Sequence, residues 1–181
     1  MVDQSYKGKI LVVDDNPDLS EFIKQELVNH NYYVKTAKKA KHAIKICNKE
    51  DFDIGIIDYN LNNYTGIELI NDLEKIIPAM DYIIVTGEAS LDNAIEAFQH
   101  DKILYYEDKP INFDRLISYI DQKFKQKEME EALKKSEERY RLIVENVHDG
   151  IEITQNDRII FFNEQFANML GYEKEELTNI K

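Results

Sequence analysis

Two apolar runs in this sequence are each followed by carboxylates. The run Ile10–Val13 leads to Asp14 and Asp15, and the run at residues 54–57 leads to Asp58. Short apolar runs of this kind predict strands that are buried on both faces of a parallel sheet. An acid that follows such a strand lies at the carboxyl edge of the sheet, where open α/β folds bind ligands. We therefore predict a functional site centred on Asp58.

Two later apolar runs lead to a hydroxyl and an ammonium group. The first is followed by Thr86, and the second is followed by Lys109. Neighbouring carboxylates repel one another unless a cation lies among them, and Mg²⁺ binds one or two carboxylates together with water and phosphate oxygens. An aspartate can also attack phosphorus and form an aspartyl-phosphate. The pattern predicts Mg²⁺-dependent phosphoryl transfer to Asp58, with Lys109 and Thr86 contacting the transferred group.

The segments between these residues alternate between strand and helix patterns. Strands are predicted at residues 10–13, 31–36, 53–57, 82–85 and 103–106. Apolar residues have helical spacing over residues 17–30, 40–47, 66–77, 91–98 and 113–124, with Ser90 as the N-cap of the fourth helix. This alternation predicts an α/β fold in which helices cover both faces of a parallel sheet.

The composition changes after Phe124. Residues 125–141 contain no Gly or Pro and consist mostly of strong helix formers. Two interpretations stay open, a coiled-coil seam through which the C-terminal helix forms a homodimer, or a solvated rigid spacer. The apolar residues of this region are widely spaced: Met129, Leu133, Tyr140, Ile143, Val144 and Val147.

The last part of the chain predicts a small α+β unit. Residues 151–154 and 158–162 have the pattern of two short strands joined by a turn. A short helix then ends at Gly171, and another begins at Tyr172. Two strands and two short helices cannot bury a core of their own, so we expect this unit to be incomplete.

The overall composition excludes several classes of function. A net charge of −12 disfavours nucleic-acid binding, which requires clustered Lys and Arg. Cys47 is the single cysteine, so an intrachain disulfide is excluded and a buried, inert thiol is expected. No apolar stretch is long enough to cross a membrane and no signal sequence is found, which favours a soluble, cytoplasmic chain. The histidines at 30, 42, 100 and 148 do not have metal-ligand spacing.

Residues 8–125 resemble the receiver domain of the response regulators of two-component signalling. The motifs that carry the resemblance are Ile-Leu-Val-Val-Asp14-Asp15-Asn-Pro, Ile-Ile-Asp58-Tyr-Asn60-Leu with Gly66 after it, Val-Thr86-Gly87-Glu88, and Tyr106-Glu-Asp-Lys109-Pro110. The resemblance implies a five-stranded parallel sheet in the order 2-1-3-4-5. It also implies phosphorylation by a histidine kinase or a phosphotransfer protein.

The same resemblance implies a role for each site residue. It implies Asp58 as the phosphoacceptor, with Thr86 and Lys109 contacting the phosphoryl group. The implied Mg²⁺ ligands are Asp14, Asp15, Asp58 and the backbone carbonyl of Asn60. The resemblance also implies Tyr106 as an aromatic switch that turns inward when Thr86 moves, and Lys109-Pro110 as a candidate cis bond. Simpler roles stay open: Asp14 as the cap of the first helix, Thr86 as a strand-end residue and Tyr106 as a packing residue.

Residues beside the predicted phosphoacceptor suggest how long the phosphate persists. Gly87 is small, so the phosphodonor is expected to reach Asp58 without obstruction. Asn60 and Glu88 are polar and able to orient an attacking water, so we expect a readily hydrolysed phosphate. Asn62 stands where the family usually has Pro, and we expect a less rigid loop there.

Residues 136–181 resemble the beginning of a PAS sensory domain. The resemblance is carried by Ser136-Glu-Glu-Arg-Tyr-Arg-Leu-Ile-Val-Glu-Asn, Asp149-Gly150-Ile, Asn163-Glu-Gln-Phe-Ala-Asn-Met-Leu-Gly171-Tyr and Glu175-Glu-Leu. The expected division is therefore a receiver domain at 8–125, a helical linker at 126–144 and a partial PAS-like domain at 145–181. No cofactor is assigned to the PAS-like part.

The leading hypothesis is a phosphorelay switch that passes its signal through the C-terminal helix to a PAS-containing output. An alternative is the N-terminal fragment of a hybrid sensor histidine kinase, although no kinase core is visible and a receiver catalyses only its own phosphorylation and dephosphorylation. An aspartate-based phosphatase typically has Asp-x-Asp after the first strand, and the sequence here is Asp14-Asp15-Asn16. A flavin-binding electron carrier would need a phosphate-cradling loop at that place, where the two acids would repel a phosphate.

Overall fold

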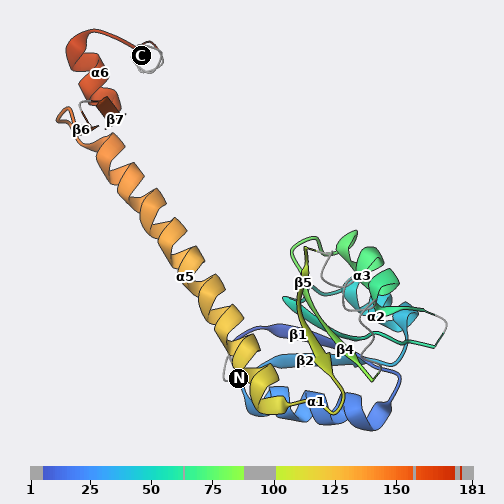
Figure 1. Cartoon of the computed structure of the whole chain (residues 1–181). Helices are drawn as coiled ribbons and strands as arrows, with labels where there is room; N and C mark the ends of the chain where they lie inside the picture. The colour runs from blue at the N-terminus through green and yellow to red at the C-terminus, as the bar shows by residue number, and fades with distance from the viewer. Residues whose placement is uncertain (1–5, 63, 88–100, 157, 174–175, 177–181) are drawn as a thin grey trace, which may run out of the picture. The chain divides into compact units, whose positions relative to one another are not determined.

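The computed structural model describes residues 6–62, 64–87, 101–156, 158–173 and 176. The chain divides into two compact units, Met1–Phe124 and Lys125–Lys181 (Figure 1). The first unit contains a five-stranded parallel sheet in the order β2-β1-β3-β4-β5, which confirms the expected fold and strand order. The strands are β1 (Lys9–Val13), β2 (Tyr33–Ala37), β3 (Ile54–Asp58), β4 (Asp81–Thr86) and β5 (Ile103–Asp108).

Helices cover both faces of this sheet, as the sequence pattern predicts. Side chains alternate between the two faces of a strand, so β1 contributes to two separate cores. Leu11 and Val13 pack with α2 (Ala40–Cys47) and α3 (Gly66–Glu74), whereas Ile10 and Val12 pack with α1 (Pro17–Asn29) and the first turns of α5 (Phe113–Asn146). All four of these β1 side chains are fully buried, which explains the continuous apolar run.

Local sequence signals fix where the helices next to the site begin. The Asn16 side chain accepts hydrogen bonds from the backbone N–H groups of Asp18 and Leu19 at the start of α1, where Pro17 is the first residue. Thr65 and Glu68 form a reciprocal capping box at the start of α3. The cap of the first helix is therefore Asn16 and not Asp14.

Two predicted helices differ from the sequence expectation or lie outside the described residues. α3 ends at Glu74, three residues before the predicted end at 77, because the chain passes into turns ahead of Pro78. The predicted helix that Ser90 would cap lies outside the described residues.

Helix α5 has 34 residues and continues without a break past Phe124. Leu116, Ile117 and Ile120 are buried against the sheet, and Phe124 packs against the ring of Tyr32 with 5.2 Å between ring centroids. In the described part of the chain, neither this helix nor any other is long and apolar enough to cross a bilayer.

Asp121 on α5 holds two residues from the beginning of the chain. It accepts hydrogen bonds from the Lys7 ammonium at 2.7 Å and from the Tyr32 hydroxyl at 2.7 Å. The Lys7 ammonium also lies 5.4 Å from the centroid of the Tyr32 ring. We call these three residues the Asp121 clasp, because they join α5 to the segments before β1 and β2.

The second unit contains an antiparallel hairpin and a short helix. β6 (Glu152–Gln155) pairs with β7 (Arg158–Phe162), and α6 (Glu164–Leu170) ends at Gly171 with a left-handed φ of 80°. The fully buried Asn163 joins these elements to the end of α5, since it accepts from the N–H groups of Ile151 and Phe166 and donates to two carbonyls. The predicted helix that begins at Tyr172 lies mostly outside the described residues.

Candidate functional site

The predicted site residues meet at the carboxyl edge of the first sheet. Asp14 directly follows β1, Asp58 is the last residue of β3 and Thr86 is the last residue of β4. Lys109 directly follows β5. Because all the strands are parallel, their carboxyl ends lie at one edge, and residues far apart in the sequence become neighbours there.

Three carboxylates form the centre of the site. Asp14, Asp15 and Asp58 each offer an oxygen atom, and these atoms all lie within 4.8 Å of one another. Asp14 and Asp58 are buried, with 2% and 6% of their surface exposed, whereas Asp15 is exposed. Carboxylate oxygens on a partly open edge suit a hard divalent cation such as Mg²⁺, which keeps several water ligands. The donor set therefore fits the predicted metal.

The Lys109 ammonium bridges the two buried acids. It donates to Asp14 Oδ2 at 2.8 Å and to Asp58 Oδ2 at 2.9 Å. Burial raises the pKa of Asp58, Lys109 opposes this shift, and the nearby charge of Asp14 adds to it, so that the net pKa is raised. Burial lowers the pKa of Lys109, but its hydrogen bonds to both acids outweigh burial and the pKa is raised. Lys109 is therefore charged at neutral pH.

The loops after β4 and β5 hold Lys109 at the sheet edge. The backbone N–H of Lys109 donates to the carbonyl of the fully buried Thr86 at 2.7 Å. The Lys109-Pro110 peptide bond is cis, as predicted. A Cβ added to Gly87 would find only Lys109 Cδ, at 3.9 Å, within 4 Å among the described residues. The small residue therefore leaves the described side of the site open.

Tyr106 lies on β5 beside Thr86. Its ring packs against the core that contains α2 and α3, and its hydroxyl is buried. Burial raises the pKa of Tyr106, and the neighbouring Thr86 hydroxyl opposes that shift. The Tyr106 ring therefore points inward, next to Thr86. This position fits both a packing role and the predicted switch.

The loop after β3 contributes two asparagines. The backbone N–H of Asn60 donates to Asp58 Oδ1 at 3.3 Å. Asn62 has a left-handed φ of 57°, which proline cannot adopt because its ring fixes φ near −65°. The Asn62 amide donates to Asp15 Oδ2 at 2.8 Å, so it orients the exposed acid. Glu88, the other residue predicted to affect phosphate lifetime, lies outside the described residues.

Comparison with known proteins identifies the family of each part of the chain. Residues 10–121 match the sequence profile of the response regulator receiver domain. The chain belongs to the receiver domain family. Residues 138–180 match the profile of the PAS domain, so a receiver domain is followed by a PAS domain.

Curated relatives share the receiver domain. The chain is 30% identical over 117 residues to the transcriptional regulatory protein GlrR of Escherichia coli K12, which covers 65% of this chain and 26% of that protein. It is 28% identical over 110 residues to the response regulator protein PilR of Pseudomonas aeruginosa, covering 61% of this chain and 24% of that protein. The chain thus spans about a quarter of the length of these relatives.

Solved structures show the same fold. A CheY-like receiver domain from Methanospirillum hungatei is 32% identical, has a TM-score of 0.64 and matches 70% of this chain and 99% of its own. A response regulator protein from Burkholderia pseudomallei, solved with a phosphorylated aspartic acid, a calcium ion and citrate, is 25% identical with a TM-score of 0.59. That match covers 94% of this chain and 96% of the other.

One feature near the receiver site was missed by the sequence analysis. The carboxylate of Glu107 on β5 is only 1% exposed, and it accepts from the Arg115 guanidinium at 2.9 Å through both oxygens. It also accepts from the backbone N–H of Asn112 at 3.0 Å. These bonds close the loop that carries Lys109 onto the start of α5. No sequence signal pointed to them, because the partners lie in a strand, a loop and a helix.

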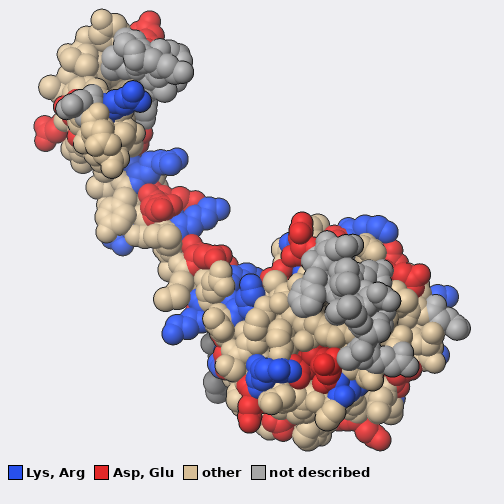
Figure 2. All heavy atoms as spheres, in the orientation of Figure 1, with Lys and Arg blue, Asp and Glu red and all other residues tan. Residues whose placement is uncertain are grey.

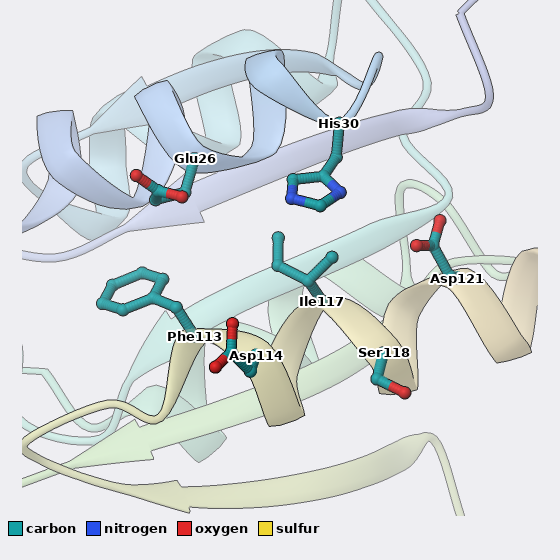
Figure 3. Close-up of a pocket in the computed structure, with 7 residues that line it drawn as sticks. All are labelled: Glu26, His30, Phe113, Asp114, Ile117, Ser118 and Asp121. Atoms are coloured by element: carbon teal, nitrogen blue, oxygen red, sulfur yellow. The ribbon is translucent and has the colours of Figure 1, made fainter.

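The receiver domain also has a pocket away from the site residues. A cavity of about 310 Å³ lies between α1 and α5, and Figure 3 shows Ile117 and His30 pointing into the space between the two helices. None of the predicted site residues lines it. The residues that line it are Glu26, His30, Phe113, Asp114, Ile117, Ser118 and Asp121. Its walls carry acids from both helices, but one of these, Asp121, is already bound within the Asp121 clasp.

Proposed function

We propose that Asp58 is the phosphoacceptor of a two-component phosphorelay and that it receives its phosphoryl group from a histidine kinase or a phosphotransfer protein. The observation that carries this proposal is the ammonium of Lys109 held between two buried carboxylates, with a third acid beside them. This arrangement combines a nucleophile, a cation site and a fixed positive charge within one sheet edge.

The proposed reaction uses one oxygen of Asp58 as the nucleophile. A bond forms between that oxygen and phosphorus, the bond between phosphorus and the donor imidazole breaks, and the imidazole nitrogen takes up a proton. The Lys109 ammonium and the Thr86 hydroxyl contact the phosphoryl oxygens and stabilise their charge. Asp14, Asp15, Asp58 and the backbone carbonyl of Asn60 would hold Mg²⁺, which when bound would neutralise negative charge on the transferred group.

A solved relative supports this chemistry. The response regulator protein from Burkholderia pseudomallei contains a phosphorylated aspartic acid and a calcium ion, and its match covers 94% of this chain. The proposed output runs from Thr86 and Tyr106 through α5 to the PAS domain. The proposed division is a receiver at 8–125, a helical linker at 126–144 and a PAS-like domain at 145–181, and the break between the compact units after Phe124 supports the first boundary.

Incubation with Mg²⁺ and acetyl phosphate tests the proposal. We expect an acid-stable, base-labile mass gain of one phosphoryl group that disappears in Asp58→Asn and when a chelator removes Mg²⁺. Asp53→Asn is the matched control, because Asp53 lies just before the opposite end of β3 and its role as an acceptor for the backbone N–H of Lys9 is retained by an amide oxygen. An adduct that persists in Asp58→Asn would disprove the assignment.

The lifetime of the phosphate tests the proposed role of Asn60. Asn60 is exposed and adjoins the phosphoacceptor through its backbone, so its amide is available to orient an attacking water. We expect Asn60→Met to lengthen the half-life of the aspartyl-phosphate several-fold without slowing its formation to the same degree. The half-life is followed by the decay of the base-labile mass gain, and an unchanged half-life would remove Asn60 from the mechanism.

A further inference from the structure

The second half of α5 carries an exposed apolar stripe. Met129, Leu133, Tyr140 and Ile143 are 63%, 61%, 66% and 51% exposed. Aromatic and aliphatic side chains of this size are normally buried when they recur along one face of a helix. Within the described residues of the second unit, the hairpin and α6 contact α5 through Asn163 and Glu164 at Val144 and Glu145, and these contacts leave the stripe uncovered.

The spacing of the stripe is that of a coiled coil. With Ser136 counted between Leu133 and Tyr140, successive positions are separated by four and three residues in alternation, which gives the average of 3.5 residues on which a two-stranded seam depends. In heptad terms, Leu133 and Tyr140 occupy a positions, and Met129 and Ile143 occupy d positions. The small residue Ser136 occupies the remaining d position between Leu133 and Tyr140, and α5 ends at Asn146 before another a position is reached.

We propose that this stripe is the interface through which a second copy of the chain binds, as a parallel two-stranded coiled coil over residues 125–146. A symmetric dimer buries the same stripe from both copies, so no other partner is needed. The seam contains few apolar side chains, and we expect a reversible, concentration-dependent dimer. This inference concerns a surface outside the phosphorylation site and does not depend on the proposed function.

The charges that flank the stripe favour the parallel arrangement. In a parallel pair, a g residue faces the e residue five positions later in the other chain, which brings Lys125 next to Glu130 of the second copy. Gln126, at an a position, donates to Glu130 Oε1 at 2.8 Å, so the Glu130 carboxylate already leans toward the stripe. Figure 2 shows side chains of both charges along this half of α5.

The antiparallel arrangement is disfavoured by the same residues. When two stripes pair antiparallel about their common centre, e faces e and g faces g. Glu137 would then face Glu137 of the second copy, and Arg139 would face its own counterpart, which places like charges together. The parallel pairing contains one attractive contact of this kind and neither of these repulsions.

The oligomeric state of the full chain tests the proposal with two matched variants. Leu133 and Leu142 are both exposed, at 61% and 64%, but Leu142 occupies a c position outside the stripe. Sedimentation equilibrium of the wild type should fit a dimer that dissociates on dilution. Leu133→Lys should raise the dissociation constant at least about tenfold, and Leu142→Lys should change it less than about twofold.

Two outcomes of this measurement would overturn the proposal. The wild-type chain remaining monomeric at high micromolar concentration would exclude the interface. Equal weakening by Leu133→Lys and Leu142→Lys would show that the stripe is not the contact. Circular dichroism checks that both variants fold.

Disulfide trapping tests the parallel register. The buried native thiol is first removed by Cys47→Ala. In that background, Leu133→Cys should form an interchain disulfide on mild oxidation, because identical a positions face each other only in a parallel pair. Lys134→Cys, one residue along at an outward b position, should not. A dimer in which Leu133→Cys fails to cross-link would overturn the parallel register.

Discussion

Lys109 is the residue on which the charge balance of the site depends. Asp14 and Asp58 are both buried, and the Lys109 ammonium is the one described cation within hydrogen-bonding distance of both. A metal that binds there competes with an internal positive charge, because both are attracted by the same carboxylate oxygens. The same ammonium is proposed to stabilise the phosphoryl group. Removing the Lys109 ammonium should therefore strengthen metal binding and slow phosphorylation.

We predict that Lys109→Met binds Mg²⁺ several-fold more tightly but is phosphorylated by acetyl phosphate at least about tenfold more slowly. Isothermal titration measures the first quantity and mass spectrometry the second. Lys75→Met is the matched control, since Lys75 is 73% exposed and pairs with Asp72 on the surface, and both Mg²⁺ affinity and phosphorylation rate should be unchanged. A weaker affinity for Mg²⁺ in Lys109→Met would contradict the competition.

Cys47 gives a pH dependence that can be isolated from the other titrating groups. The thiol is 3% exposed, and burial followed by the nearby charge of Asp51 raises its pKa to about 11. In the unfolded chain the thiolate forms near the usual value of 9.0, so the unfolded state loses its proton first. The resulting stability is complete below pH 9 and falls as the pH rises from there to about 11.

We predict that wild type loses about 1 kcal/mol more stability than Cys47→Ala between pH 8 and pH 10. The cavity left by the substitution lowers the stability of Cys47→Ala at both pH values, so only the difference between the two slopes is informative. Urea unfolding at each pH measures it. Parallel slopes for the two proteins would mean that the thiol titrates in the folded state as it does in the unfolded chain.

The site residues could be predicted from the sequence because each directly follows or ends a buried strand. Asp14, Asp58 and Lys109 are brought together by parallel strands alone, and no knowledge of the loops was required. Asn62 was noticed only as a departure from the family, because its hydrogen bond to Asp15 depends on a left-handed φ that the residue type permits but does not dictate. Glu107 was missed because an acid in a strand pattern normally indicates an exposed position.

At the scale of the elements, the β5–α5 connection is held by a charge inside the fold. Burial raises the pKa of Glu107, but Arg115 and the backbone N–H of Asn112 outweigh burial and lower it. A carboxylate whose pKa is lowered by folding contributes stability that is fully present above the pKa of the unfolded chain. That stability is lost as the pH falls through the lower pKa of the folded state. The Arg115 side chain is 60% exposed, so water screens its part of the pair.

We predict that Arg115→Ala destabilises the receiver domain at neutral pH, because it leaves the buried Glu107 carboxylate without its charged partner, and that the loss is smaller than for a fully buried pair. The double variant Glu107→Gln with Arg115→Ala should recover part of that loss, because no unpaired charge then remains inside. Both are measured by urea unfolding. Arg115→Ala should also slow phosphorylation, because Arg115 closes the loop that carries Lys109. An unaltered rate would show that the Glu107–Arg115 pair contributes to stability alone.

Most elements could be predicted from periodicity, and their exact ends could not. The order of strands and helices follows from apolar runs that alternate with helical spacing. The caps at Asn16 and Thr65 were not predicted, since Asp14 was the residue considered as the cap of the first helix. The early end of α3 depends on how the chain approaches Pro78. The helix predicted at 113–124 and the helical linker predicted at 126–144 form a single helix that ends at Asn146, because no residue within it favours a break.

At the scale of the whole chain, the two units have different sources of stability. The receiver domain has cores on both faces of its sheet. In the described part of the second unit, by contrast, large apolar side chains such as Ile153, Ile160 and Met169 are at least half exposed. Helix α5 belongs to both units, so its first turns share the stability of the receiver and its later turns do not.

Hydrogen exchange along α5 should reveal this boundary. We predict that α5 amides before Phe124 exchange only by opening of the receiver domain, whereas those after it exchange faster in dilute solution. Raising the protein concentration should slow exchange only in the second group, because dimer formation stabilises only that part of the helix. Uniform exchange along the helix at every concentration would contradict the prediction.

The Asp121 clasp has a consequence for how that boundary is maintained. Lys7 and Asp121 are 114 residues apart, so their contact joins the two ends of the receiver domain. Lys7 and the first third of α5 are therefore coupled, and both lie against the buried Tyr32. Beyond the clasp, protection of the helix depends on association and not on folding.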